Sequence, residues 1–230
     1  KLQQERGDRR PGDAVMTELS NSGWGGFAEY VCAKEATLGL KPTTATFAQA
    51  AALPCSGQTA LQAVRDHGKV RADHRVLVHG ATGGVGTFAV QIVKAMGAQA
   101  TAVGSTRKLE VLRSIGADHV IDYTQEDCTK NGQQYDVIID AGAYRPMTDF
   151  RESLTQTGTY VMVGGSTRAF FAMSFKGPLI TKKSGRQFTT FLEKPNADDL
   201  AQLKAYVEAG QVTPAIDRTY ALRDVPDAIR

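Results

Sequence analysis

The chain has 230 residues, 42% of them hydrophobic, which suffices for one large domain or two small ones. The formal net charge is +3 and the basic residues are dispersed, so we expect a small anionic partner and neither nucleic acid nor a membrane surface. Cys32, Cys55 and Cys128 are odd in number and far apart, which disfavours a disulfide framework and favours a reducing, cytoplasmic location.

The first third of the chain predicts short strands followed by helices. Residues 1–10 are charged without an apolar signal core, and no apolar run approaches the ~18 residues of a membrane helix. Turn and hydrophobic patterns predict strands at 15–16 and 27–32 and helices at 46–53 and 59–67. Thr46 suits the N-cap of the first helix, Pro54 interrupts that helix, and Gly68 closes the second.

Strands and helices alternate from Val76 onward. The strand beginning there is followed by predicted strands at 98–103, 119–121, 135–139, 159–163 and 186–191. Helices are predicted after Gly86, through 109–115 and at 198–209. Alternation at this spacing predicts an α/β fold, a doubly wound parallel sheet of Rossmann type with helices on both faces.

A glycine-dense turn separates the Val76 strand from its helix. Gly83 and Gly86 supply two glycines of a G-x-G-x-x-G pattern, and Ala81 stands at its first position. Glycines let the backbone approach phosphates, and the free N–H groups at the start of a helix favour negative charge. The candidate residues for a dinucleotide pyrophosphate are therefore Ala81, Thr82, Gly83, Gly84, Val85 and Gly86.

The end of the next strand bears on which dinucleotide binds. An NAD-selecting domain carries an acidic side chain there, for the ribose 2′-OH. Here the strand ends without a carboxylate, and Ser105, Arg107 and Lys108 follow it. A hydroxyl and two cations suit the 2′-phosphate of NADP(H). The alternative is that Arg107 and Lys108 are solvated residues opening a helix, but cations at a helix N-terminus oppose its dipole.

Two later strand ends face the same crevice in a doubly wound sheet. Asp140, Ala141 and Gly142 follow the strand predicted at 135–139; Val163 ends the strand predicted at 159–163 and Gly164 follows it. Small residues there leave room for a ribose and a nicotinamide, although ordinary turn chemistry also explains them. We assign Ala141, Gly142, Val163 and Gly164 to cofactor binding.

Several motifs taken together resemble the medium-chain dehydrogenase/reductase superfamily, in its zinc-free, quinone oxidoreductase-like branch. They are Gly12-Asp13-x-Val15, Gly26-Phe27-Ala28-Glu29-Tyr30-Val31, Ala50-Ala51-Ala52-Leu53-Pro54 with Gly57-x-Thr59-Ala60, the phosphate turn, Gly116-Ala117-Asp118-x-Val120-Ile121-Asp122-Tyr123 and Gly210-x-Val212-x-Pro214-x-Ile216. The resemblance implies remnants of a mainly β GroES-like catalytic domain at 1–42 and 196–230 around a Rossmann domain at 43–195. It also implies truncation at both ends, so that the chain is a fragment or a shortened homologue.

The resemblance implies roles for individual residues. Thr59 lies near the nicotinamide, and Ser105, Arg107 and Tyr123 surround the adenosine 2′-phosphate; Tyr123 is alternatively a packing aromatic at a strand end. The implied activity is NADPH-dependent hydride transfer to a quinone, enone or other activated carbonyl without a metal. No catalytic residue is assigned, because the polar groups for protonation are expected upstream of Lys1. By analogy the protein is a homodimer, joined through an edge strand at 187–191.

The sequence bears in two ways on whether the protein binds zinc. Zinc-dependent relatives carry a four-cysteine lobe where this chain has the cysteine-free interval 16–26. Cys55 stands where zinc alcohol dehydrogenases have a catalytic ligand, but catalytic zinc needs three protein ligands. We expect Cys55 to be a small buried residue. The alternatives are a zinc-dependent alcohol dehydrogenase using Cys55 and a truncated NADPH-binding protein without turnover.

Overall fold

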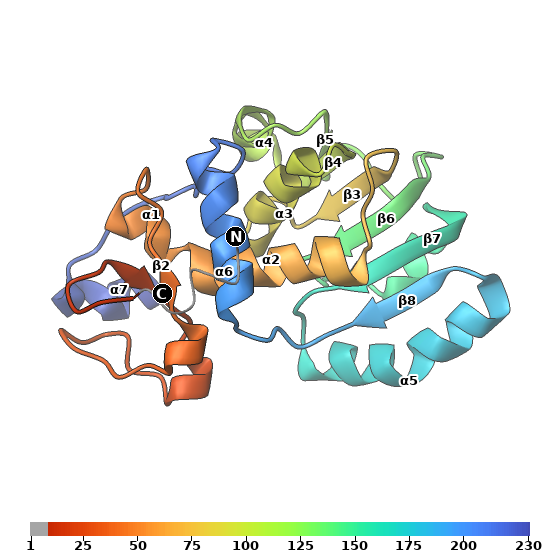
Figure 1. Ribbon diagram of the computed structural model, residues 1–230. Helices are drawn as coiled ribbons and strands as arrows, with labels where there is room; N and C mark the ends of the chain where they lie inside the picture. The colour runs from red at the N-terminus through yellow and green to blue at the C-terminus, as the bar shows by residue number, and fades with distance from the viewer. Residues whose placement is uncertain (1–8) are drawn as a thin grey trace. The chain divides into compact units, whose positions relative to one another are not determined.

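The computed structural model describes residues 9–230, which form two compact units (Figure 1). One unit is Thr59–Glu193; the other combines the chain up to Gln58 with Lys194–Arg230. Most of the charged N-terminal segment, residues 1–8, lies outside the described residues. The functional domain bounds at 42/43 and 195/196 stay a prediction.

The unit Thr59–Glu193 is built on one six-stranded sheet in the order β5-β4-β3-β6-β7-β8, with every neighbouring pair parallel. The strands are β3 (Arg75–His79), β4 (Gln99–Gly104), β5 (His119–Asp122), β6 (Tyr135–Asp140), β7 (Leu154–Met162) and β8 (Gln187–Thr190). The predicted α/β, Rossmann-like fold is therefore confirmed, and all six predicted strands form. The strand predicted at 159–163 begins five residues earlier, at Leu154.

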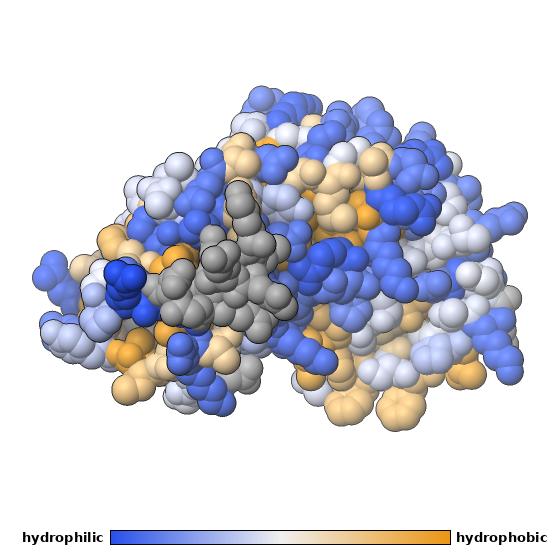
Figure 2. All heavy atoms as spheres, in the orientation of Figure 1, coloured by the Kyte–Doolittle hydropathy of each residue, from blue (hydrophilic) through white to orange (hydrophobic). Residues whose placement is uncertain are grey.

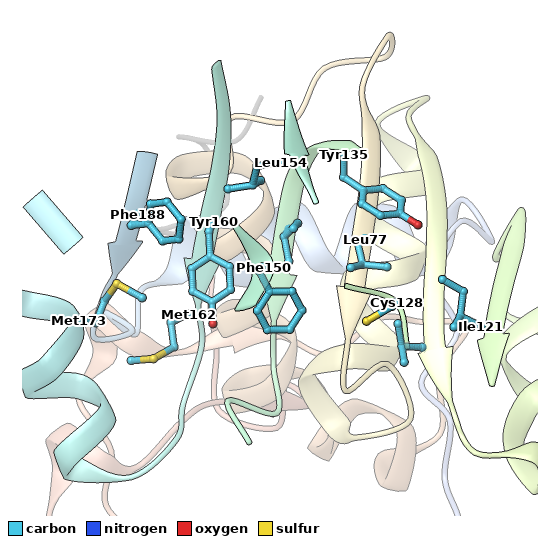
Figure 3. Packing of buried hydrophobic residues seen from close by; sticks show 12 residues of the cluster. Leu77, Ile121, Cys128, Tyr135, Phe150, Leu154, Tyr160, Met162, Met173 and Phe188 are labelled. Atoms are coloured by element: carbon cyan, nitrogen blue, oxygen red, sulfur yellow. The ribbon is translucent and has the colours of Figure 1, made fainter. Parts of the chain in front are cut away.

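Helices α3 (Gly84–Ala95), α4 (Leu109–Ser114) and α5 (Thr167–Ser184) accompany this sheet. Figure 3 shows the core formed between sheet and connecting segments, with Leu77, Phe150, Tyr160 and Phe188 among its members. Each of these four side chains is at most 5% exposed. Full burial of such a side chain contributes roughly 1.5–3 kcal/mol, so this cluster stabilises the sheet.

Gly86 determines how closely α3 approaches the end of β3. A Cβ placed on Gly86 would lie 2.2 Å from the carbonyl oxygen of Gly80 and 2.6 Å from Cα of Ala81. No side chain fits at that distance. The third glycine of the motif is thus required for helix–strand packing, as its position in the pattern predicts.

The long helix α5 is absent from the sequence-based prediction. Gly177 and Pro178 lie inside it, and both residues argue against a helix by propensity. Tertiary packing overrides this preference: α5 packs on β8, and a Cβ on Gly177 would lie 2.9 Å from the carbonyl oxygen of Phe188. Neither α5 nor any other helix in the described part of the chain is long and apolar enough to cross a membrane.

The second unit pairs a short hairpin-like sheet with helices. β1 (Val15–Met16) and β2 (Gly39–Leu40) are antiparallel, and α6 (Ala197–Glu208) packs on β2. The segment after β2 forms α1 (Phe47–Ala51), which Thr46 and Gln49 cap reciprocally, as expected of an N-cap at Thr46. The chain end folds into a 3₁₀ turn and α7 (Val225–Ile229).

One prediction for this part of the chain is wrong. Residues 27–32 form no strand and are largely exposed, because an alternating pattern needs a pairing partner and no described segment pairs with it. The helix predicted at 46–53 is interrupted before Pro54, as expected: α1 stops at Ala51, and a π-helical turn, Leu53–Gly57, follows with Pro54 near its N-terminus. A first helical turn needs no donor from proline. That turn leads directly into α2 (Gln58–Gln62).

Candidate cofactor site

The carboxyl ends of β3, β4, β5 and β6 open into one pocket of about 560 Å³. It is lined by His79, Gly80, Thr82, Val103, Tyr123, Glu126, Asp127, Cys128, Tyr144 and Arg145. Parallel strands place their ligand sites at this edge. Of the residues proposed from the sequence for cofactor binding, Thr82 and Tyr123 line the pocket.

The glycine turn provides a concave backbone surface at the start of α3. Gly80 takes φ 75°, a left-handed conformation that turns the chain sharply at the end of β3. Gly83 is the N-cap of α3 and uses no side chain to cap it. Thr82, Gly83 and Gly84 are exposed at the start of a 12-residue helix, whose first-turn N–H groups have no partner within the helix. This surface fits a pyrophosphate.

The loop after β4 carries the proposed 2′-phosphate residues. Arg107 and Lys108 are exposed in the 3₁₀ turn Thr106–Lys108, and Ser105 precedes them half-buried. Among the described residues neither cation forms an ion pair. The structure does not bring these three residues into the pocket lining; they lie on the segment that leaves β4 beside it.

Asp122 is a carboxylate near this loop that the sequence reasoning did not consider. It ends β5, opposite Gly104 in the parallel register, and accepts hydrogen bonds from the hydroxyls of Thr106 and Thr124. The hydroxyl of Thr106 foremost lowers the pKa of Asp122. Its oxygens thus already have donors. The sequence alone does not place Asp122 here, because only the parallel pairing of β4 and β5 brings their ends together.

An ion pair forms part of the pocket wall. Arg145 donates to both carboxylate oxygens of Asp127, with N–O distances of 2.7 and 3.0 Å. This guanidinium is the main reason that the pKa of Asp127 lies far below its ordinary range. Burial raises the pKa of the neighbouring Cys128 thiol to about 11, so Cys128 is a neutral thiol at pH 7.

Behind the pocket, Asp140 accepts hydrogen bonds from four donors. They are Nδ1 of His79 at 2.8 Å, the hydroxyl of Tyr160 at 2.5 Å, and the backbone N–H groups of Gly142 at 3.2 Å and Ala143 at 2.8 Å. Burial alone would raise the pKa of this fully buried carboxyl, but the contacts with His79 and Tyr160 outweigh it and lower the pKa. Asp140 is therefore ionised at neutral pH.

The residues proposed for the nicotinamide end lie at three separate places. Ala141 and Gly142 are half-buried on the loop after β6. Val163 is buried after β7 and donates its N–H to the carbonyl oxygen of Asp140, while Gly164 is exposed with φ 82°. Thr59 is half-buried in α2 and does not line the pocket. Their contacts with a nicotinamide stay predictions.

Cys55 does not lie in the core as expected. The turn Leu53–Gly57 buries Leu53, Pro54 and Gly57 and directs Cys55 to the opposite, exposed side. Within residues 9–230 no three His, Cys, Asp or Glu side chains come together as a metal site would require. The metal-free chemistry expected from the sequence stays a prediction.

A parallel six-stranded sheet with a glycine turn opening a helix at its carboxyl edge defines a dinucleotide-binding domain of Rossmann type. Comparison with known proteins specifies the family. Residues 115–230 match the family described as zinc-binding dehydrogenase. The chain belongs to the medium-chain dehydrogenase/reductase superfamily, is quinone oxidoreductase-like within it, and is an oxidoreductase.

Two relatives and one solved structure illustrate the similarity. The chloroplast envelope quinone oxidoreductase homolog of Arabidopsis thaliana is 33% identical over 228 residues, which cover 95% of this chain and 68% of the relative. The NADPH-dependent alkenal/one oxidoreductase of the same plant is 34% identical over 91% of this chain and 51% of its own length. The quinone oxidoreductase from Coxiella burnetii superposes with a TM-score of 0.83 at 28% identity, covering 96% of this chain and 68% of that structure.

Proposed function

We propose that this protein transfers a hydride from NADPH to a quinone, an enone or another activated carbonyl compound, without a metal. The observation that carries the proposal is the exposed N-terminal turn of α3 beside a basic loop, at the open edge of the sheet. Reduced nicotinamide supplies the hydride when it is bound; the chain has to hold and orient it.

The cofactor-binding roles follow from position in the fold. The turn Ala81–Gly86 would bind the pyrophosphate through backbone N–H groups. Ser105, Arg107 and Lys108, with Tyr123 at the pocket, would bind the adenosine 2′-phosphate. The loop residues after β6 and β7 would border the ribose and nicotinamide. The preference for NADPH over NADH depends on the residues proposed for the 2′-phosphate. The nearby carboxylate of Asp122 already accepts hydrogen bonds from two hydroxyls, so we do not assign it to the ribose 2′-OH of NADH.

The substrate class is proposed from the relatives. The names of two of them specify a quinone and an alkenal or enone as substrate. Conjugated carbonyls of this kind accept a hydride and build up enolate or phenolate charge, which hydrogen-bond donors stabilise when no metal does so. Metal-free chemistry is part of the proposal. Its support is the cysteine-free interval 16–26, where zinc-dependent relatives carry a four-cysteine lobe.

Cofactor binding is the first test. Titration of the chain with NADPH and NADH, followed by intrinsic fluorescence and thermal unfolding, should show tighter binding of NADPH. Arg107→Glu should weaken NADPH binding about 10- to 100-fold, since a charge-assisted hydrogen bond contributes roughly 1.5–3 kcal/mol, and should leave NADH binding nearly unchanged. Arg113→Glu, an exposed charge on α4, is the matched control. Equal binding of both cofactors by the unaltered chain would refute the assignment of Ser105 and Arg107.

The second test of the proposed function is whether the protein oxidises NADPH when a substrate is added. NADPH consumption with a panel of quinones and enones, as opposed to saturated aldehydes, distinguishes the proposed reductase from a cofactor-binding protein without turnover. Metal analysis before and after Cys55→Ala distinguishes it from a zinc-dependent alcohol dehydrogenase. Stoichiometric zinc that is lost with Cys55 would overturn the metal-free proposal.

We further propose that the protein forms a homodimer and acts in the cytoplasm. β8 pairs with β7 on one side and is the edge of the sheet on the other. α5 lies against β8 and exposes Phe171, Phe175 and Leu179, spaced four residues apart on one face of the helix. Figure 2 shows apolar side chains gathered along the lower margin of the molecule, where α5 lies in Figure 1. An open strand edge next to an apolar stripe favours a second copy as its partner.

A further inference from the structure

We propose that Asp140 is a positioning residue for the cofactor crevice: its buried carboxylate links the end of β3 to the loop after β6 and fixes both. This proposal rests on the proposed function, because the crevice is assigned to NADPH. The carboxylate itself is fully buried and lies behind the surface that a cofactor would contact.

Asp140 connects three neighbouring strands at their carboxyl ends. His79 ends β3, Asp140 ends β6, and Tyr160 lies near the end of β7. The donors from these strands converge on the one carboxylate, with His79 and Tyr160 on different oxygens. In Figure 3 the hydroxyl of Tyr160 points toward the carboxyl ends of the strands. Burial in the core leaves water little access, so these donors are what keeps the carboxylate ionised.

The same carboxylate holds the loop after β6 in an unusual conformation. Ala143 takes φ 48°, a left-handed region that costs a residue with a Cβ roughly 1–2 kcal/mol, and its own N–H donates to Asp140. The N–H of Gly142 donates to the same oxygen. A loop that keeps a strained residue needs surrounding contacts that determine its shape, and Asp140 supplies two of them.

The loop after β6 is in direct contact with the phosphate turn. A Cβ on Gly80 would lie 2.8 Å from the backbone nitrogen of Gly142, so the turn after β3 and the loop after β6 touch without intervening side chains. On the other side, a Cβ on Gly165 would lie 2.7 Å from Cβ of Ala143. The three loops at this edge therefore pack on one another around a single carboxylate. Losing that carboxylate should loosen the site before it unfolds the domain.

The first measurement needs no variant. Hydrogen exchange of the unaltered chain without cofactor should show the amides of Gly142 and Ala143 protected, although these loop residues are only half-buried. Exchange of both amides at the rate of an unstructured loop would overturn the proposal. This outcome is independent of whether the chain binds NADPH.

The second measurement uses Asp140→Ala and Asp140→Asn with an unrelated buried acid as control. Asp140→Ala should expose both amides to exchange and raise the Kd for NADPH about tenfold or more, because binding must then order the loop. Asp140→Asn keeps an acceptor oxygen for the two amides and should recover most of the protection and most of the affinity. Asp199→Ala, at a buried carboxylate on α6, should lower the melting temperature without changing either quantity.

The outcomes separate the two proposals. If the unaltered chain fails to bind NADPH while Gly142 and Ala143 depend on Asp140 for protection, the proposed function fails and the structural role stands. If NADPH binds equally to the unaltered chain and to a folded Asp140→Ala, the positioning role is wrong. An equal loss of affinity in Asp140→Asn and Asp140→Ala would assign the effect to the charge and not to the loop contacts.

Discussion

At the scale of single residues, a carboxylate at the carboxyl edge of the sheet is not by itself a ligand-binding group. Asp122 and Asp140 both end strands at this edge, but the hydroxyls and N–H groups around them occupy their oxygens. The exposed groups there are instead Arg107, Lys108 and Tyr123. This basic, hydroxyl-containing rim beside engaged carboxylates supports the preference for NADPH that we propose.

Glu208 gives a residue-scale prediction for stability against pH. Lys204 first, and then the N–H of Thr43, lower the pKa of this carboxyl to about 2. A depressed folded pKa stabilises the protein above the unfolded value of roughly 4.3, and that stabilisation is lost as pH falls toward 2. Glu208→Gln should lower the free energy of unfolding at pH 7 by about 1–2 kcal/mol, allowing for partial solvent exposure.

Urea unfolding between pH 7 and pH 3 checks this expectation. The difference between the unaltered chain and Glu208→Gln should shrink below about pH 4.3, because the carboxyl then takes up a proton in the unfolded chain but stays ionised in the folded chain down to about pH 2. Glu110→Gln is the control, because the Glu110 side chain is 87% exposed in its pair with Arg113 and should contribute little. A difference that stays constant down to pH 3 would rule out the charge of Glu208 as its source.

At the scale of elements, the contact between β3 and α3 sets the geometry of the phosphate turn. Gly86 lies where any side chain would collide with backbone atoms of Gly80 and Ala81, which cannot move away without disturbing β3. Gly83, three residues earlier, has ordinary φ and open space: its Cβ would lie 3.6 Å from the carbonyl oxygen of Gly80. The two glycines of one motif therefore have different structural roles.

This difference is testable by a matched pair of substitutions. Gly86→Ala should destabilise the unit by about 1–3 kcal/mol or more through overpacking, whereas Gly83→Ala should leave thermal unfolding nearly unchanged. Differential scanning calorimetry without cofactor measures both. Because Gly83→Ala should remain folded, its effect on cofactor binding at the turn can be measured without a change in stability. Similar melting temperatures for both variants would contradict the packing role of Gly86.

At the scale of the whole molecule, the apolar stripe on α5 and the open edge of β8 lead to a prediction on assembly. Phe175→Asp places a charge in the middle of the stripe, where the unaltered side chain is 74% exposed. We expect this variant to sediment as a monomer while the unaltered chain sediments as a dimer, because burying an unpaired charge at an interface is unfavourable. Val111→Asp on α4 should leave the mass unchanged. A monomeric unaltered chain would refute the proposed homodimer.

Periodicity and turn chemistry by themselves determined the α/β class, the six parallel strands, the Thr46 cap and the glycine turn, because each depends on residues near one another in sequence. Only the tertiary structure decided what depends on partners. Residues 27–32 remain irregular without a neighbouring strand, and α5 forms across Gly177 and Pro178 because β8 supports it. Likewise, the sequence around an aspartate at the end of an apolar strand does not show which groups donate hydrogen bonds to its carboxylate. His79, Tyr160 and the loop amides meet at Asp140 only because the parallel register aligns three strand ends.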